Sequence, residues 1–157
     1  MKKQSLSFKL FATDAAKGID RKWKQLVPVF KEAAREVLRT EFEDIHKFAL
    51  TVILQSDEEL RELNVRALDH DYYTDIITFE IDREEHVIEA ELYLSVERAR
   101  ENALRFKVSD RNELARLVIH GMLHLAGYSD KLAADKKRMR RKERYFLALI
   151  SKTVSIE

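Results

Sequence analysis

Two histidines spaced four residues apart are the side chains best suited to catalysis in this sequence. They lie in the segment HGMLHLAGYSD, residues 120–130. On a helix, residues four apart share one face, with their Cβ atoms about 5–6 Å apart. His120 and His124 can therefore bind one small cation from the same side. Taken alone, such a pair is also common as surface or core filler, so the residues that follow decide between the two interpretations.

Gly127 and Asp130 supply the turn and the third ligand that the histidine pair lacks. A third ligand on the next helical turn would strain the geometry, but a glycine commonly ends a helix in a left-handed conformation. The chain can then turn back and bring the Asp130 carboxylate toward the imidazoles. Three protein ligands of these types leave a fourth position open, as in catalytic zinc sites. We predict one Zn²⁺ per chain, held by His120, His124 and Asp130.

The residue after the first histidine constrains the reaction. Familiar zinc peptidases carry a general-base glutamate at this position, whereas this chain has Gly121. A hydrolase remains feasible, because zinc allows water to ionise near neutral pH. We name Asp75 and Glu91, on neighbouring predicted strands, as candidate catalytic carboxylates. The alternative is that both are solvated strand residues.

Helices and strands must position these groups, and apolar patterns with turn residues predict where they lie. Strands are expected at residues 6–12, 48–54, 74–81 and 87–95. Helices are expected from 28 to about 39, after Ser56, after Ser95, from Asp110 to Leu125 or Ala126, and from about 132 to 151. The two kinds of element do not alternate strictly, so the fold class is α+β.

Some features of these predicted helices are specific enough to compare with a structure. Asp110 and Glu113 fit a capping box at the start of the histidine-bearing helix. The helix after Ser56 would place its apolar residues, Leu60, Leu63 and Ala67, on one face. The last helix is expected to bury an apolar stripe of Leu132, Met139, Phe146 and Ile150.

The composition is that of a globular protein in a reducing compartment. Apolar residues make up 45% of the 157 residues, charged residues make up 36%, and cysteine is absent. This excludes disulfides and thiolate metal sites. No apolar run approaches the roughly 20 residues of a membrane helix. We expect one cytoplasmic domain spanning residues 1–157, with no membrane partner and an oligomeric state that the sequence leaves open.

Basic residues crowd near the C-terminus although the net charge is only +1. Lys and Arg bind phosphate backbones, and this run begins just after Asp130. The alternative is a solvated helix face stabilised by pairs with acids such as Glu143. The candidate RNA contacts are Lys136, Lys137, Arg140, Arg141 and Arg144, and the candidate stacking platforms for bases are Tyr72, Tyr73 and Tyr128.

Three segments resemble the YbeY endoribonucleases over roughly residues 48–150. Residues 120–130 resemble the family's metal motif HGxLHLxGYDH. Leu63-Asn64 with DYYTDIITF at residues 71–79 resembles its LN…DxPTDVLSF stretch, without a gap. Residues 91–95, ELYLS, are a weaker match to its GDIxIS segment.

This resemblance implies a zincin-like mixed sheet of about four strands packed with helices. The metal site would lie on the central helix and the turn that follows it. The implied activity is zinc-dependent, single-strand-specific endoribonuclease action in rRNA processing, notably at the 3′ end of small-subunit (16S) rRNA, and in ribosome quality control. The implied partners are single-stranded RNA and the small ribosomal subunit.

The chain departs from the family pattern at several positions. Asp130 stands where the family has a third histidine, and Leu68 stands where it has an arginine thought important for cleavage. Arg66 is close in sequence but would point about 200° away on a helix. Tyr73, Thr78 and Glu91 replace the family's proline, serine and aspartate.

Two other functions remain open on the sequence. The loss of the family arginine at Leu68 favours a non-catalytic ribosome or RNA-binding factor with a structural zinc. A metallohydrolase of peptides or small esters is the third alternative, and Gly121 argues against it.

Overall fold

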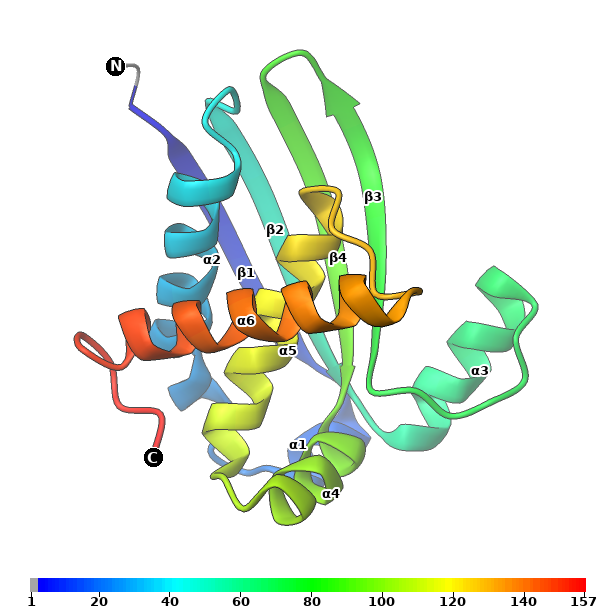
Figure 1. Ribbon diagram of the computed structural model, residues 1–157. Helices are drawn as coiled ribbons and strands as arrows, with labels where there is room; N and C mark the ends of the chain where they lie inside the picture. Colours follow the sequence, from blue (N-terminus) through cyan, green and yellow to red (C-terminus); the bar gives the residue numbers. More distant parts are fainter. Residues whose placement is uncertain (1–2) are drawn as a thin grey trace.

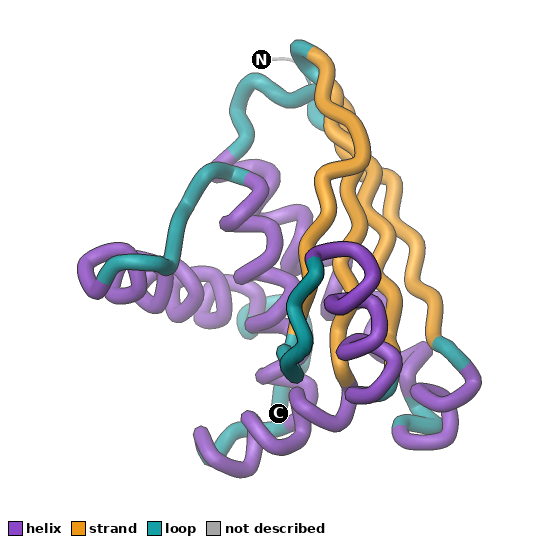
Figure 2. The backbone as a smooth tube through the Cα atoms, turned by 90° about the vertical axis from the view of Figure 1, so that its right-hand side faces the viewer, coloured by secondary structure: helices purple, strands orange, loops and turns teal. Residues whose placement is uncertain are grey.

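A four-stranded sheet with helices gathered mainly on one side forms the framework of the protein (Figures 1 and 2). The structure is a computed structural model that describes residues 3–157. Its elements in chain order are β1 (Ser5–Ala12), α1 (Asp14–Ile19), the 3₁₀ turn η1 (Trp23–Leu26), α2 (Val27–Glu41), β2 (Lys47–Gln55), α3 (Asp57–Leu68), β3 (Ile76–Glu84), β4 (Val87–Ser95), α4 (Val96–Phe106), α5 (Asp110–Leu125) and α6 (Ala133–Ile150).

The sheet is mixed, with strand order β1-β2-β4-β3. β1 and β4 both run parallel to β2, whereas β3 is an edge strand antiparallel to β4. Alternate residues of β2 point into the core, and Phe48, Leu50, Val52 and Leu54 are all buried. The predicted α+β class, with a zincin-like sheet of about four strands, is confirmed.

Helices α2 and α5 pack against this apolar face, and α6 crosses both of them (Figure 1). α5 approaches the sheet closely at Gly121. A Cβ atom added there would lie 2.7 Å from Leu92 Cδ2 and 3.0 Å from Ile76 Cδ1. The glycine therefore lets the histidine-bearing helix rest directly on β3 and β4.

Two helices begin at the N-cap residues that the sequence predicts, and a third helix does not. The Ser56–Glu59 capping box begins α3, and the Ser95 hydroxyl accepts the Arg98 N–H at the start of α4. The predicted Asp110–Glu113 box is wrong. Ser109 is the N-cap of α5 and accepts from the Asn112 N–H, so Glu113 is free to turn inward, where it is buried.

The apolar stripe of the last helix is mostly as predicted. Met139, Phe146 and Ile150 are buried. Leu132 is 68% exposed, because it precedes the first turn of α6 as its N-cap residue. On α3, Ala67 is exposed too, because the buried side of that helix follows Leu60 and Asn64.

The short helices between residues 14 and 26 were not predicted from the sequence, and β3 begins at Ile76, two residues later than expected. Within residues 3–157, no helix combines the length and apolar character needed to span a membrane.

A candidate metal site on helix α5

The turn after α5 folds back as the glycine predicts. Gly127 has φ +102°, its N–H donates to the His124 carbonyl, and the Tyr128 N–H donates to the Leu123 carbonyl. This is the double hydrogen bond of a Schellman motif, which satisfies the last carbonyls of a helix and reverses the chain. The reversal brings Asp130 back over the last turns of α5.

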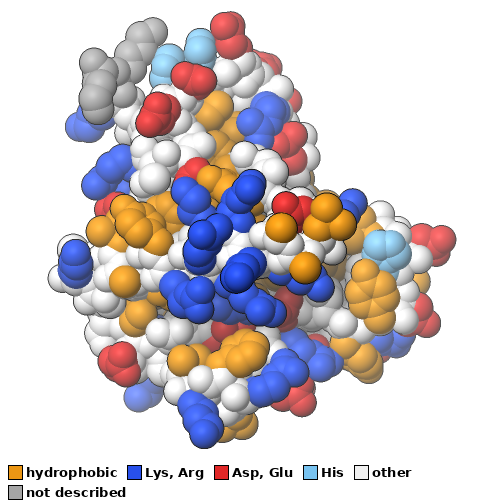
Figure 3. Space-filling model, in the orientation of Figure 1, with side chains coloured by type: hydrophobic (Ala, Val, Ile, Leu, Met, Phe, Trp, Pro, Cys, Tyr) orange, Lys and Arg blue, Asp and Glu red, His pale blue; other side chains and the backbone are white. Residues whose placement is uncertain are grey.

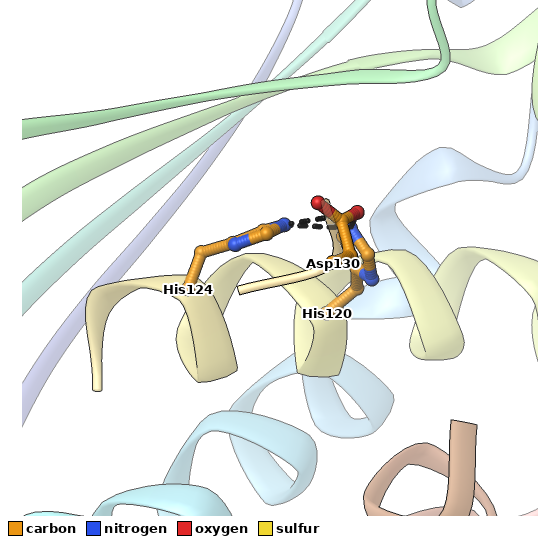
Figure 4. Close-up of side chains that lie close together, drawn as sticks. All are labelled: His120, His124 and Asp130. Atoms are coloured by element: carbon orange, nitrogen blue, oxygen red, sulfur yellow. Dashed lines mark hydrogen bonds and ion pairs between the residues drawn. The ribbon is translucent and has the colours of Figure 1, made fainter. Parts of the chain in front are cut away.

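The three predicted ligands converge on one point above α5 (Figure 4). The two Nε2 atoms of His120 and His124 are 3.0 Å apart, and Asp130 Oδ2 lies 3.5 Å from each of them. A tetrahedral zinc with ligand distances of about 2.0–2.2 Å separates its ligands by roughly 3.3–3.6 Å. The spacing of these side chains fits one small cation.

Hydrogen bonds on the far side of each imidazole fix its orientation. His124 Nδ1 lies 2.9 Å from the Tyr128 carbonyl, and His120 Nδ1 lies 2.6 Å from Glu143 Oε2. A carbonyl and an ionised carboxylate can only accept, so both Nδ1 atoms carry the proton. In the neutral rings both Nε2 lone pairs then face the Asp130 carboxylate, an arrangement that suits a cation.

The glutamate behind His120 belongs to a buried ionic network. Arg116 donates to Glu143 Oε1 over 3.1 Å and to both oxygens of Glu113 over 2.7 and 2.8 Å. Burial raises the pKa of Glu143, but the hydrogen bond from His120 and the charge of Arg116 outweigh burial and lower it below its usual range. Glu143 is therefore ionised and holds His120 in place.

The same network reaches Asp75, one of the predicted catalytic carboxylates. Asn102 donates to Asp75 Oδ2 over 3.1 Å and to Glu113 over 3.0 Å. Asp75 lines a depression of about 350 Å³ together with His120, His124 and Asp130. This hollow, which Leu68 and Tyr72 also line, is called the α3 depression below.

Glu91, the second predicted carboxylate, lies on the other face of the sheet. Its neighbours Ala90 and Leu92 are buried on the helix-covered face, and Leu92 contacts α5 at Gly121. Residues alternate between faces along a strand, so Glu91 points away from α5, where it accepts a hydrogen bond from the Tyr93 hydroxyl. The structure does not bring Glu91 to the candidate metal site.

The predicted basic residues divide between two sides of α6. Lys136, Arg140 and Arg144 line a pocket of about 660 Å³ that His120 and Asp130 also line, called the α6 pocket below. Arg141 lines a separate hollow beside Thr40 and Tyr145, and Lys137 lines neither this hollow nor the α6 pocket. Figure 3 shows Lys and Arg side chains gathered across the face that α6 crosses.

Pairing with Glu143 does not account for these charges, since that side chain faces inward to His120 and Arg116. Lys136, Arg140 and Arg144 form no ion pair with the described part of the chain, residues 3–157.

The three tyrosines considered for base stacking have different surroundings. Tyr73 donates to Glu58 and lies against Arg61 and Arg98, and Tyr128 donates to Glu41. Tyr72 is 54% exposed and lines the α3 depression. Of the three, Tyr72 is the one that lines a hollow together with the candidate ligands, and one face of its ring stacks on His70 at a centroid distance of 5.3 Å.

Glu143 and Arg116 are the residues of this site that sequence reasoning missed. From the sequence, Glu143 is expected only as a partner for surface cations, and no role is predicted for Arg116. Both lie on helical faces that carry core residues, since Glu143 is four residues from Met139 and three from Phe146. A charged residue in an apolar stripe was the available signal, because buried charges need partners.

Comparison with known proteins identifies the family. The family model described as Endoribonuclease YbeY matches residues 13–151. The endoribonuclease YbeY of Cytophaga hutchinsonii is 44% identical over 100 residues, which is 64% of this chain and 70% of the relative. That of Flavobacterium psychrophilum is 45% identical over 94 residues, or 60% and 66% of the two chains.

A solved structure has a similar fold. The solution structure of TM1509 from Thermotoga maritima is 30% identical, with a TM-score of 0.60 over 89% of this chain and 86% of that one.

The fold and the site together define a zincin-like α+β protein, with a pair of histidines on a central helix and a carboxylate returning from the turn after it. The family match spans nearly the whole described chain. This chain belongs to the endoribonuclease YbeY family.

Proposed function

We propose that this protein is a zinc-dependent endoribonuclease that cleaves single-stranded RNA. The observation that carries the proposal is the convergence of His120 Nε2, His124 Nε2 and Asp130 Oδ2 within 3.5 Å of one another. Membership of a family whose relatives are named endoribonucleases supplies the class of substrate.

Zinc fits the donor set of two imidazoles and one carboxylate. When bound, it would polarise a phosphodiester oxygen and help water to ionise. The side chain of Asp130 is 41% exposed and that of His124 is 30% exposed. Structural zinc sites are closed by four protein ligands, whereas catalytic sites keep a position open. The three-residue cluster and its exposure favour the catalytic alternative.

Asp75 is the proposed proton acceptor for the attacking water. Asn102 holds Asp75 Oδ2, and Arg116 Nη2 lies 3.9 Å from the same oxygen. Oδ1 makes no hydrogen bond with the described residues and is free to take a proton. The expected signature of this role is loss of cleavage in Asp75→Asn with the metal retained.

The phosphates of the substrate are proposed to lie along Lys136, Arg140 and Arg144, which share a pocket with His120. Of the five predicted RNA contacts, Lys137 and Arg141 face elsewhere and are not part of this proposal. Cations that lack a protein partner are available to neutralise phosphates, which makes binding sensitive to salt.

In the cell we propose a role in rRNA processing, at the 3′ end of 16S rRNA, and in ribosome quality control. The single domain would act in the cytoplasm on RNA of the small ribosomal subunit. These assignments rest on the family resemblance and not on a contact in the structure.

A non-catalytic RNA-binding factor with a structural zinc is the second candidate, and Leu68 favours it. Leu68 is 42% exposed and lines the α3 depression with the three candidate ligands. An arginine there would face the substrate. Arg66 does not take its place, because it lies outside the lining of the depression and its Nε donates to the Glu62 carbonyl of its own helix.

Peptide hydrolysis is disfavoured by the packing of α5. The position of the general base of a zinc peptidase is held here by Gly121, and any side chain in its place would have to displace methyl groups of Leu92 and Ile76.

Elemental analysis and an RNA cleavage assay on one preparation test the proposal. We expect about one zinc per chain, and loss of both metal and cleavage in His120→Ala and His124→Ala. Metal-free protein that cuts RNA at the full rate would refute metal dependence. Zinc-saturated protein that binds RNA in a salt-dependent way but does not cut it would establish the second candidate.

A further inference from the structure

The α6 pocket opens beside the candidate metal site on the side away from the α3 depression. His120 and Asp130 line both hollows, so the metal site lies where the two meet. A strand crossing the site would enter one hollow and leave by the other. The volume of the α6 pocket, about 660 Å³, falls in the ~300–1,000 Å³ range of small-molecule sites.

The two hollows differ in charge. The lining of the α3 depression contains no Lys or Arg from residues 3–157. The α6 pocket is lined by Lys136, Arg140 and Arg144, spaced four residues apart along one face of α6, and its glutamates Glu113 and Glu143 are already paired with Arg116. All three are exposed and lack ion-pair partners in the described chain. The α6 side of the metal site is therefore the side suited to an anionic group.

One wall of the α6 pocket is apolar and carries an exposed aromatic ring. Phe106, the last residue of α4, is 52% exposed. Val108, Met139 and Leu147 also line the pocket. Any base can stack on an aromatic ring, and such stacking is largely independent of sequence. A cluster of cations beside this wall suits a ligand that combines a flat ring with a phosphate.

Asn112 adds a group able to read the edge of a ring. It lies in the first turn of α5, is half-buried, and lines the pocket. Its side-chain amide forms no hydrogen bond with residues 3–157, whereas the neighbouring Arg116 is held by Glu113 and Glu143. An amide offers both donors and an acceptor, the combination that recognises base edges.

We infer that the α6 pocket is a nucleotide-binding subsite, in which Phe106 stacks on a base, Asn112 hydrogen-bonds its edge, and Arg140, Arg144 and Lys136 hold its phosphate. This subsite rests on the proposed endoribonuclease function. The subsite would hold one nucleotide of the RNA next to the scissile bond, and Asn112 would select the base of that nucleotide.

The subsite is tested by NMR titration of the full zinc-loaded chain. The ligands are the four nucleoside 5′-monophosphates and inorganic phosphate. We expect Phe106→Ala to weaken nucleotide binding about tenfold and to leave phosphate binding unchanged. Arg140→Ala is expected to weaken the binding of both nucleotides and inorganic phosphate. Asn112→Ala changes the order of preference among the four bases.

Two matched controls accompany these variants. Phe11→Ala removes a phenyl ring that is 54% exposed on β1 and does not line the pocket. Arg138→Ala removes a cation of α6 that lines a different hollow. Neither control changes nucleotide binding. Thermal unfolding of Phe106→Ala and Asn112→Ala checks that both variants remain folded.

Inorganic phosphate binding as tightly as the nucleotides would overturn the subsite, since the pocket would then recognise charge alone. So would unchanged nucleotide binding in both Phe106→Ala and Asn112→Ala. If the wild type cuts RNA while these variants bind nucleotides normally, the subsite fails and the proposed function stands. If the wild type binds nucleotides through Phe106 but cuts no RNA, the subsite stands and the proposed function fails.

Discussion

His120 Nδ1 and Glu143 Oε2 are 2.6 Å apart, although 23 residues separate them in the sequence. This contact joins α5 to α6 behind the candidate metal site. A carboxylate behind a ligating histidine fixes the ring, and loss of such a partner typically costs about 10–100-fold in metal affinity. We expect Glu143→Gln to weaken zinc binding by a factor in this range, measured by competition with a chelator of known affinity.

Glu113→Gln is the matched control for that change. Glu113 and Glu143 both pair with Arg116, but only Glu143 contacts His120. The control is expected to lower stability and to leave zinc affinity close to that of the wild type. Equal loss of zinc affinity in both variants would mean that the network acts through general stability and not by orienting His120.

Asp130 is the candidate ligand at which this chain departs from the resembled family motif, and exchange of this residue tests its role. Asp130→His restores the family's third imidazole and is expected to retain about one zinc per chain. Asp130→Ala leaves two ligands and is expected to lose most of its metal in the same elemental analysis. Retention of full zinc by Asp130→Ala would show that the carboxylate is not a ligand.

Gly127 adopts a backbone conformation that other residues enter at a cost. Its φ of +102° lies in the left-handed region, where a side chain costs about 1–2 kcal/mol. Gly127→Ala is expected to lower the free energy of unfolding by about this amount, measured by urea denaturation, and to weaken zinc binding because the turn positions Asp130.

Gly18→Ala is the control for the loss of a glycine. Gly18 lies in α1, has no positive φ, and has open space where a Cβ would stand. This change is expected to be neutral or slightly stabilising. A similar destabilisation in both variants would count against the conformational explanation for Gly127.

The two sides of α6 give a test of phosphate binding at constant net charge. Each phosphate contact contributes about 0.7 to the slope of log K against log salt concentration for single strands. The triple variant Lys136→Ala, Arg140→Ala, Arg144→Ala is expected to reduce that slope by about 2. The triple variant Lys137→Ala, Arg138→Ala, Arg141→Ala removes three cations outside the α6 pocket and should change it much less. Equal slopes in the two variants would indicate general electrostatic attraction.

Glu59 links acid stability to the start of α3. Burial raises its pKa, but hydrogen bonds from the Ser56 N–H and the Thr13 hydroxyl outweigh burial and lower the pKa below the ordinary value of 4.5. A lowered pKa means that ionised Glu59 stabilises the fold above the unfolded value, and that this contribution is lost as the pH falls through the folded value.

Urea denaturation of Glu59→Gln checks this relation. The variant is expected to be less stable than the wild type at pH 7, and the difference should shrink as the pH falls below 4.5. A difference that stays constant over this range would assign the effect to hydrogen-bond geometry instead of charge.

The parts of the site that are close in sequence could be predicted, and those that depend on packing between distant elements could not. His120, His124, Gly127 and Asp130 span 11 residues, and helix periodicity with one glycine fixes their arrangement. Glu143 reaches His120 only because α6 crosses α5. No local pattern gives that crossing.

The alternation of apolar residues along β4 indicates which face of the sheet Glu91 occupies. The apolar residues of β4, Ile88, Ala90, Leu92 and Leu94, alternate with it and are buried toward the helices. Strict alternation already assigns Glu91 to the opposite face. The fold class, by contrast, was predictable because the long periodic segments of α2, β2 and α5 carry most of the core.

Helix α6 presents Glu143 inward to His120, and Arg140 and Arg144 outward to solvent, within five consecutive residues. Residues within one turn of an α-helix are tied by its backbone hydrogen bonds and move as a unit. A shift of α6 that repositions Arg140 and Arg144 would therefore also displace the carboxylate that orients the His120 ring.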